Sequence, residues 1–281
     1  MVRITFCLIC FLLSWSSCTF AKDVIFAKRF GDDVRGSYPR ALLELALTKT
    51  GKNYVLRSSE NEMTQSRSMT QLERGQGIDV VWIGTSKEAE QQLLPIRIPI
   101  YRGLLGYRLF IINKNLAPRL AQVNTLSELV NYTVGQGIGW SDIEILENAG
   151  LIVASAPYDK ILKLIANNRL HLFPRGVIEI YPELEASRAQ YPDLVADEHL
   201  VLTYRFAMFY FVNRNNRILA DDIYAGLLEA YNDGSFMQLF NSHPEIQASL
   251  TRAKLDQRIR IEIPNPTLSA QTQIIDSRFW E

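Results

Sequence analysis

The sequence predicts an α/β protein of two lobes, each a mixed sheet flanked by helices, joined by two crossing strands. From Asp23 onward, strand-like and helix-like segments alternate, which is typical of layered α/β domains. Two similar apolar segments, 108–113 and 206–213, lie far apart in the chain, and each ends in an asparagine that a basic residue follows. We expect these to be the crossing strands, because a second complete α/β run lies between them. A single undivided α/β domain is the alternative.

The first lobe is expected to open with a strand at 24–27 and a helix from Ser37 to Lys49. Ser37 is a good helix cap, Pro39 is tolerated in a first turn, and Gly51 ends the helix. The following elements are expected at 54–56 (strand), 63–73 (helix) and 78–84 (strand). The last strand is almost continuously apolar, as in a parallel strand that is covered on both faces.

The inserted run predicts a second lobe of its own. Its elements are expected at 132–135, 151–153 and 170–173 (strands) and at 142–149 and 158–167 (helices). Helices follow at 219–231 and 236–241, and the polar C-terminal stretch with Pro264 and Pro266 is expected to pack on the first lobe. The resulting bounds are 1–21 for a signal peptide, 22–110 and 210–281 for the first lobe, and 111–209 for the second.

The chain begins with a segment that is typical of a cleavable signal peptide. Arg3 supplies a positive charge, and residues 4–15 are apolar without a charged side chain. Residues 19–21 match the small-x-small rule for cleavage before Lys22. The apolar run is shorter than the roughly 20 residues that a membrane span needs. We therefore predict export to the periplasm.

All three cysteines, Cys7, Cys10 and Cys18, lie in this segment, so the mature chain is expected to have neither disulfides nor cysteine metal sites. Lipid attachment at Cys18 is an alternative, but Trp15 stands where lipoprotein signals usually carry a leucine-like residue. Cleavage would remove one of 30 basic and none of 30 acidic residues. This near balance gives no support for nucleic-acid or anionic-membrane binding.

Four stretches of the mature chain, in this order and spacing, resemble the type II periplasmic solute-binding proteins of family 3, which serve amino-acid ABC importers. The stretches are Leu72–Val80, Pro99–Gly103, Asn168–Gly176 and Leu228–Phe236. The resemblance covers essentially all of the mature chain. It implies a bilobed clamp that holds its ligand in the cleft between the lobes.

The chain departs from this family at one position. Amino-acid binders of the family typically follow the third strand with Thr-x-x-Arg, whose guanidinium holds the ligand carboxylate. Here the run is Thr85-Ser86-Lys87-Glu88, so Glu88 stands at the arginine position. Either Lys87, Arg97 or Arg102 substitutes for the arginine, or the ligand is not a simple amino acid.

In open α/β sheets, ligands bind beyond the carboxyl ends of the strands, and this rule predicts three binding stretches. The first offers Trp82 for stacking and the hydroxyls of Thr85 and Ser86, although Trp82 as core packing is an equal alternative. The second is the glycine-rich loop that opens a helix, with Gly137, Trp140 and Ser141 as contacts. Its spacing does not match a dinucleotide fingerprint, and a purely structural loop is the alternative.

The third stretch carries Arg175, a clamp for a carboxylate or phosphate, and Glu179, a partner for an ammonium group. The alternative is that the two residues simply pair with each other at the surface. Tyr101 and Arg102 are weaker candidates for ligand binding.

The sequence favours a binding protein over an enzyme. His171, His199 and His243 stand apart, and neither a zinc motif nor a nucleophile elbow is present. A dehydratase on the same fold is an alternative, with Glu179 or Asp142 as general acid or base. A sensory module that docks on a membrane receptor is another.

We expect a monomer without cofactor or metal. Its partners are expected to be a small polar, amino-acid-like ligand and an ABC-type membrane permease or a membrane receptor, and no nucleic acid.

Overall fold

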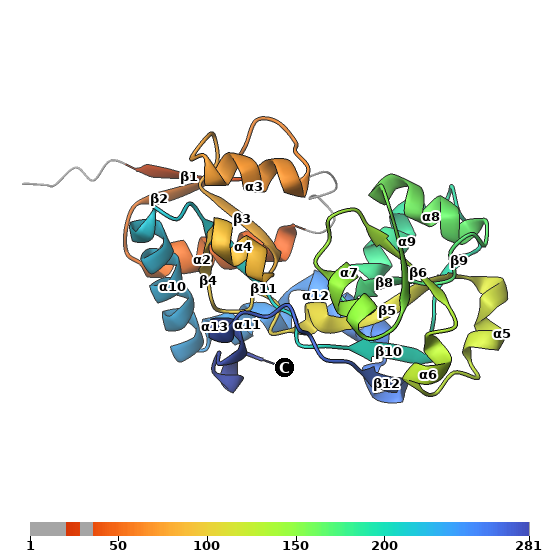
Figure 1. The fold of residues 1–281 in the computed structure, drawn as a ribbon. Coiled ribbons are helices and arrows are strands. Elements are labelled where there is room, and N and C mark those ends of the chain that lie inside the picture. The colour runs from red at the N-terminus through yellow and green to blue at the C-terminus, as the bar shows by residue number, and fades with distance from the viewer. Residues whose placement is uncertain (1–20, 29–35, 281) are drawn as a thin grey trace, which may run out of the picture.

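The computed structural model describes residues 21–28 and 36–280 of the chain, which build two five-stranded sheets and a two-stranded one (Figure 1). This confirms the predicted fold class of two lobes, each a sheet flanked by helices. The predicted signal-peptide core and the three cysteines lie outside the described residues. None of the helices within the described residues has both the length and the apolar character needed to cross a membrane.

The first sheet has the strand order β2-β1-β3-β11-β4. Its strands are β1 (Lys22–Phe26), β2 (Tyr54–Ser58), β3 (Val80–Gly84), β4 (Leu94–Ile96) and β11 (Met208–Val212). The first three strands are mutually parallel, whereas β11 runs antiparallel to both β3 and β4. The sheet therefore receives β11 from a part of the chain far from its other strands.

Both faces of the first sheet are covered, as the apolar character of β3 predicts. Val80 and Trp82 share one apolar core with α2 (Ser37–Lys49), α10 (Arg217–Asn232) and α11 (Ser235–Ser242). Val81 and Ile83 belong to a separate core with α3 (Gln65–Glu73) and α4 (Lys87–Gln92). Because side chains alternate along a strand, Trp82 points to the α2 side and Ile83 to the α3 side.

The second sheet has the order β12-β10-β5-β8, with β9 also paired to β5. Its strands are β5 (Tyr107–Asn113), β8 (Phe173–Gly176), β9 (Leu194–Ala196), β10 (Leu200–Thr203) and β12 (Ile259–Glu262). The parallel pair β6 (Thr133–Gly137) and β7 (Ile152–Ala156) lies next to β8 through a bridge between Val134 and Leu172.

Helices cover this sheet on both sides as well. Phe110 and Ile112 pack in a core with α7 (Asp142–Asn148), whereas Leu109 and Ile111 belong to the core that includes α8 (Tyr158–Ala166). The remaining helices of this half are α5 (Ala117–Leu120), α6 (Leu126–Leu129) and α9 (Ile180–Ser187).

Two chain segments cross between the sheets side by side, one leading into β5 and one leading from β10 to β11. They touch at Gly106, whose carbonyl accepts a hydrogen bond of 3.1 Å from the amide of Tyr204. A Cβ atom at Gly106 would lie 2.0 Å from the carbonyl oxygen of Tyr204 and 3.2 Å from the amide nitrogen of Phe206. Only glycine permits this close approach of the two backbones.

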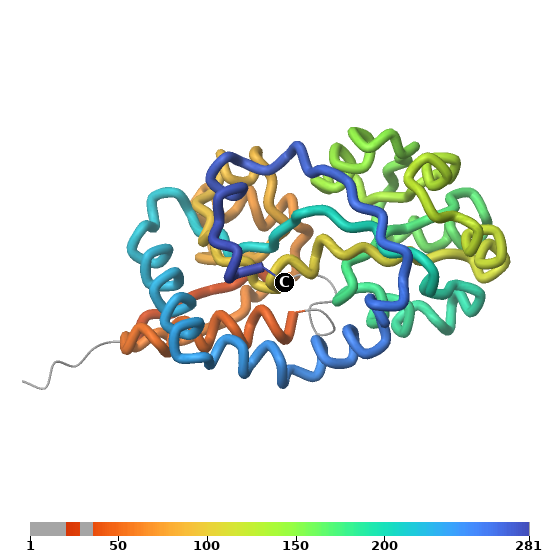
Figure 2. The backbone as a smooth tube through the Cα atoms, turned by 90° about the horizontal axis from the view of Figure 1, so that it is seen from below, coloured from red at the N-terminus to blue at the C-terminus, as the bar shows by residue number. Residues whose placement is uncertain are grey.

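The C-terminal part adds a further connection that the sequence did not predict. The helix α12 (Pro244–Ala253) leads to β12, which pairs in parallel with β10 in the second sheet. The predicted domain bounds place all of 210–281 in the first lobe, whereas β12 lies at the edge of the second sheet. The chain then returns to the first lobe (Figure 2), where the side chains of Ser269 and Thr272 donate to Glu90 at 2.7 Å each.

The described elements follow the sequence predictions closely where the apolar period is clear, as in α2 and α10. The strand expected at 170–173 begins instead at Phe173, because residues before it turn toward β6 and Leu172 makes only the single bridge. The short helices α13 (Ala270–Gln273), α5 and α6 have no counterpart in the predicted elements. The domain bounds themselves stay a prediction.

We predict that Gly106→Ala destabilises the protein by about 3 kcal/mol or more, because its methyl group would overlap the backbone of the second crossing segment. Urea unfolding followed by circular dichroism measures the change. Gly234→Ala is the matched control, since Gly234 has a φ of 82° but no atom within 4 Å of an added Cβ. That control should cost only about 1 kcal/mol of backbone strain. Equal losses for both variants would contradict the tight contact.

Candidate functional site

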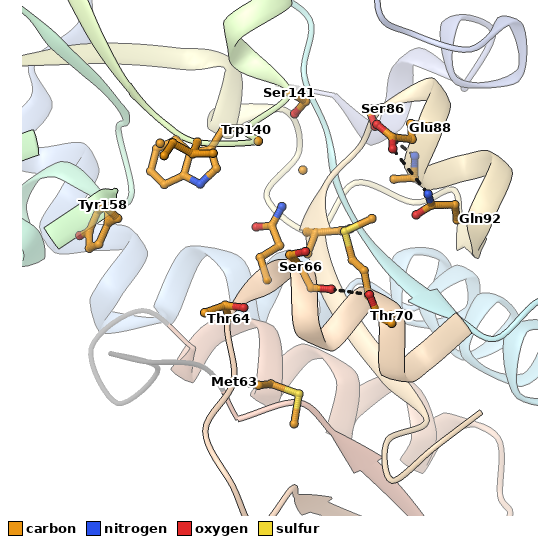
Figure 3. A pocket seen from close by; sticks show the side chains of 18 of the residues that line it. Met63, Thr64, Ser66, Thr70, Ser86, Glu88, Gln92, Trp140, Ser141 and Tyr158 are labelled. Atoms are coloured by element: carbon orange, nitrogen blue, oxygen red, sulfur yellow. Dashed lines mark hydrogen bonds between the residues drawn. The ribbon is translucent and has the colours of Figure 1, made fainter. Parts of the chain in front are cut away.

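A cleft of about 920 Å³ lies between the two lobes (Figure 3). Its first-lobe wall comes from residues 63–73 around α3, from the end of β3 and from α4. Its second-lobe wall comes from the segment 137–141 at the end of β6 and from residues 157–159, which link β7 to the start of α8. The carboxyl ends of β3, β6 and β7, each of which pairs in parallel with a neighbouring strand, thus meet at the cleft. Open α/β sheets usually bind ligands at such strand ends.

The first-lobe wall presents small polar side chains at the starts of two helices. Thr64 caps α3 by accepting a hydrogen bond of 3.3 Å from the amide of Arg67. Ser86 caps α4 in the same way, with 3.1 Å to the amide of Ala89. Between these helix starts, Met63, Met69 and Ile83 give the wall an apolar floor.

The second-lobe wall is dominated by Trp140, whose indole ring is held by its surroundings. A Cβ atom at Gly137 would lie 2.4 Å from this ring, so glycine is needed for the indole to pack on the strand end. The ring lies 6.2 Å from that of Phe173 in a stacked arrangement and 5.9 Å from that of Tyr158. On the protein side, the Cζ atom of Arg175 lies 4.7 Å from the indole centroid.

Arg175 is buried and held by two carboxylates of its own lobe. Its Nε and Nη2 atoms donate to the carboxylate of Glu183 at 2.7 and 2.6 Å, and Glu179 lies 3.2 Å away. Burial disfavours the charged guanidinium, but Glu179 and Glu183 outweigh it and raise the pKa of Arg175 above its ordinary value. Arg175 is therefore a permanent cation that supports the Trp140 ring from behind.

A second buried arginine joins the same network. Arg108 of β5 donates to Asp142, the first residue of α7, at 2.5 Å, and to Glu179 at 3.3 Å. The hydroxyl of Tyr204 accepts from Arg108 at 2.8 Å and in turn donates to Asp142. Burial opposes the charge of Arg108, yet Asp142, with smaller contributions from Tyr204 and Glu179, raises its pKa. The network thereby ties β5, β8, α7 and α9 together behind the cleft.

Four of the ten residues predicted to bind ligand line the cleft: Ser86, Gly137, Trp140 and Ser141. Arg175 and Glu179 lie behind Trp140 in the buried network. Their pairing is not at the surface, which was the alternative drawn from the sequence, because the side chain of Arg175 is only 4% exposed.

The other four predicted residues have structural contacts away from the cleft. Trp82 is buried against Phe26 and Tyr210 on the α2 side of the sheet. Thr85 donates to Glu90 at 2.7 Å. Tyr101 packs on Tyr38 with ring centroids 5.1 Å apart, and Arg102 donates to the carbonyl of Trp280 at 2.9 Å. Ligand contact by any of the ten residues stays a prediction.

The cations that could replace the missing carboxylate-binding arginine are also engaged elsewhere. The Nζ atom of Lys87 donates to the carbonyl of Pro266 at 2.9 Å. Arg97 pairs with Glu90 at 2.7 Å. Lys87 thus contacts the C-terminal segment directly, and Arg97 contacts it through Glu90. Neither residue lines the cleft among the described residues.

Sequence reasoning missed several residues that line the cleft: Met63, Met69, Ile83, Ile138, Tyr158 and the acids Glu73, Glu88 and Asp159. Tyr158 begins α8, two residues after the end of β7, so the strand-end rule could have selected it. The methionines belong to the connection between β2 and β3, where only the fold brings them to the cleft. In the described part of the chain, no three His, Cys, Asp or Glu side chains are grouped as metal ligands.

No family model and no curated protein matches the chain. Solved structures do match it, at low sequence identity. One is a periplasmic binding protein of Salmonella typhimurium with high arginine specificity, at 15% identity and a TM-score of 0.56, covering 78% of this chain and 98% of that one.

Two further matches are described differently. A histidine kinase sensor domain similar to periplasmic binding proteins has 15% identity and a TM-score of 0.54, covering 78% of this chain and 94% of that one. An ancestral amino-acid-binding protein that is a precursor of cyclohexadienyl dehydratase has 10% identity and a TM-score of 0.54, covering 79% of this chain and 93% of that one. These likenesses show the two-lobed fold of periplasmic binding proteins.

We predict that Arg175→Met destabilises the protein by about 3–5 kcal/mol, because it leaves Glu183 buried without its cation. The double variant Arg175→Met/Glu183→Leu should recover most of the loss, since an apolar pair of similar volume replaces the ion pair. Urea unfolding of both variants measures the difference. If the double variant is no more stable than the single one, the ion pair is not what Arg175 contributes.

Proposed function

We propose that this protein is an extracytoplasmic solute-binding protein, which captures a small ligand between its lobes for delivery to an ABC-type importer. The observation that carries the proposal is the cleft of about 920 Å³ whose walls come from both lobes. This volume is within the range of small-molecule sites in proteins. A ligand held by both walls would favour the closed arrangement by its extra contacts there.

The structure of the second-lobe wall supports binding by a preformed surface. Trp140 has one side packed against the protein by Phe173 and Arg175. Its position is therefore set before a ligand arrives, which reduces the entropy lost on binding. The predicted signal peptide agrees with a site in the periplasm.

A sensory role is the second candidate function, because a histidine kinase sensor domain has a similar fold. In that role the closed form would dock on a membrane receptor in place of a permease. The clamp and its ligand would be the same, and only the partner would differ.

The dehydratase alternative has less support from the geometry. Asp142 and Glu179, its candidates for general acid or base, both contact the guanidinium of Arg108. Neither belongs to the lining of the cleft among the described residues. A general acid must reach the substrate directly or through one water molecule.

We predict that Trp140→Ala abolishes the rise in melting temperature that a bound ligand gives the wild type, because it removes a large aromatic ring from the second-lobe wall. Thermal-shift screening of the mature protein against amino acids, peptides, organic acids and polyamines identifies such a ligand. Tyr224→Ala, an exposed aromatic on α10, is the control and should keep the full shift. The concentration of the hit compound is followed as well, and its consumption would indicate an enzyme.

A further inference from the structure

We propose that the cleft takes an organic cation with an apolar body and no carboxylate, such as an aryl-alkyl amine or a quaternary ammonium compound. This inference rests on the proposed function, and it names the chemical class of ligand for that same cleft. It is drawn from three properties of the described cleft wall: its charge, its apolar surface, and the state of the cations nearby.

The charged side chains that line the described part of the cleft are all acidic. Glu73 and Glu88 come from the first lobe, and Asp159 comes from the second. Asp159 pairs with its neighbour Lys160 at 2.9 Å, which offsets part of its charge. Glu88 accepts only a long hydrogen bond of 3.5 Å from the side-chain amide of Gln92. The charges of the described lining therefore favour a cation over an anion.

A ligand carboxylate has no described cation to receive it. Lys87 and Arg97 are engaged by the C-terminal segment and by Glu90, on the far side of α4 from the cleft lining. The charge of Arg175 is compensated by Glu179 and Glu183 and is covered by the Trp140 ring. Burying an anion here would cost its desolvation without a charged partner in return.

The apolar surface of the cleft requires a ligand with an apolar body. Ile138 and Tyr158 on the second lobe are 65% and 37% exposed, and both line the cleft. Met69 lines the cleft on the first lobe, and methionine adapts its shape to irregular apolar ligands. A ligand that spans the cleft would remove this surface from water and gain the corresponding hydrophobic free energy.

Trp140 and Tyr158 provide the site for the cationic group itself. Their ring centroids lie 5.9 Å apart with an interplanar angle of 35°, and both residues line the cleft (Figure 3). An ammonium group within about 6 Å of such rings is attracted by the negative potential of their faces. The hydroxyls of Thr64, Ser66 and Ser86 on the opposite wall can accept hydrogen bonds from an ammonium N–H group.

The test compares four probes that share a phenyl body and differ in charge: 2-phenylethylamine, 2-phenylethanol, phenylalanine and 3-phenylpropionate. Isothermal titration calorimetry of the mature protein at low salt measures their affinities. We expect 2-phenylethylamine to bind at least about 10-fold more tightly than phenylalanine, and 3-phenylpropionate to bind most weakly. Benzyltrimethylammonium is expected to bind as the amine does.

The double variant Glu73→Gln/Glu88→Gln tests whether charge causes this order. It should weaken binding of the amine by about 3- to 10-fold and leave the affinity for the alcohol unchanged, and any affinity for 3-phenylpropionate should rise. A general loss of structure cannot lower one affinity and raise another. Glu229→Gln, an exposed acid on α10, is the control and should change none of the affinities.

Tighter binding of phenylalanine or 3-phenylpropionate than of the amine would overturn the organic-cation proposal and leave the solute-binding function standing. Equal affinities for all four probes would overturn it as well. If no compound of any charge binds, in this set or in the wider thermal-shift screen, the proposed function fails together with the inference.

Discussion

Two buried arginines hold the cleft wall of the second lobe in place. Arg108 and Arg175 share Glu179 between them, and each has a further carboxylate partner at 2.5–2.6 Å. Because a buried charge that loses its partner costs several kcal/mol, the strands and helices that supply these groups have little freedom to shift. Trp140 packs directly on this network, so its position in the cleft is set by the core of the lobe.

The connection between the lobes sets a second constraint. The crossing segments meet at Gly106, and one continuous apolar core extends from Tyr38 in the first lobe through Tyr101 to Phe173 in the second. The C-terminal segment forms a further connection: β12 pairs with β10 in the second sheet, and the chain then returns to contact Glu90 in the first lobe. If the protein works as the proposed clamp, small changes in the crossing segments would open and close it while the packing of each lobe is kept.

For the proposed binding function, the charge of the cleft says more about the ligand than the fold does. Fold neighbours include binding proteins for arginine and a kinase sensor domain, so the fold alone does not specify a ligand. Glu88 lines the cleft, and the sequence resemblance predicts a carboxylate-binding arginine at its position. Together with Glu73 and the aromatic pair of the second lobe, it favours a ligand of positive charge.

The fold class and most of the regular elements, such as β3, α2 and α10, could be predicted from the sequence, because apolar periodicity and capping residues are local signals. The same signals placed Ser86, Trp140 and their neighbours at strand ends. Which side chains reach the cleft depends on how the elements pack in three dimensions. In a strand buried on both faces, the alternation of side chains separates the two faces but does not tell which face meets a ligand. The sequence therefore could not show that Trp82 belongs to the core. The burial of Arg175, and the position of Met63 in the cleft, depend on residues brought together from distant parts of the chain, and no local pattern reports such contacts.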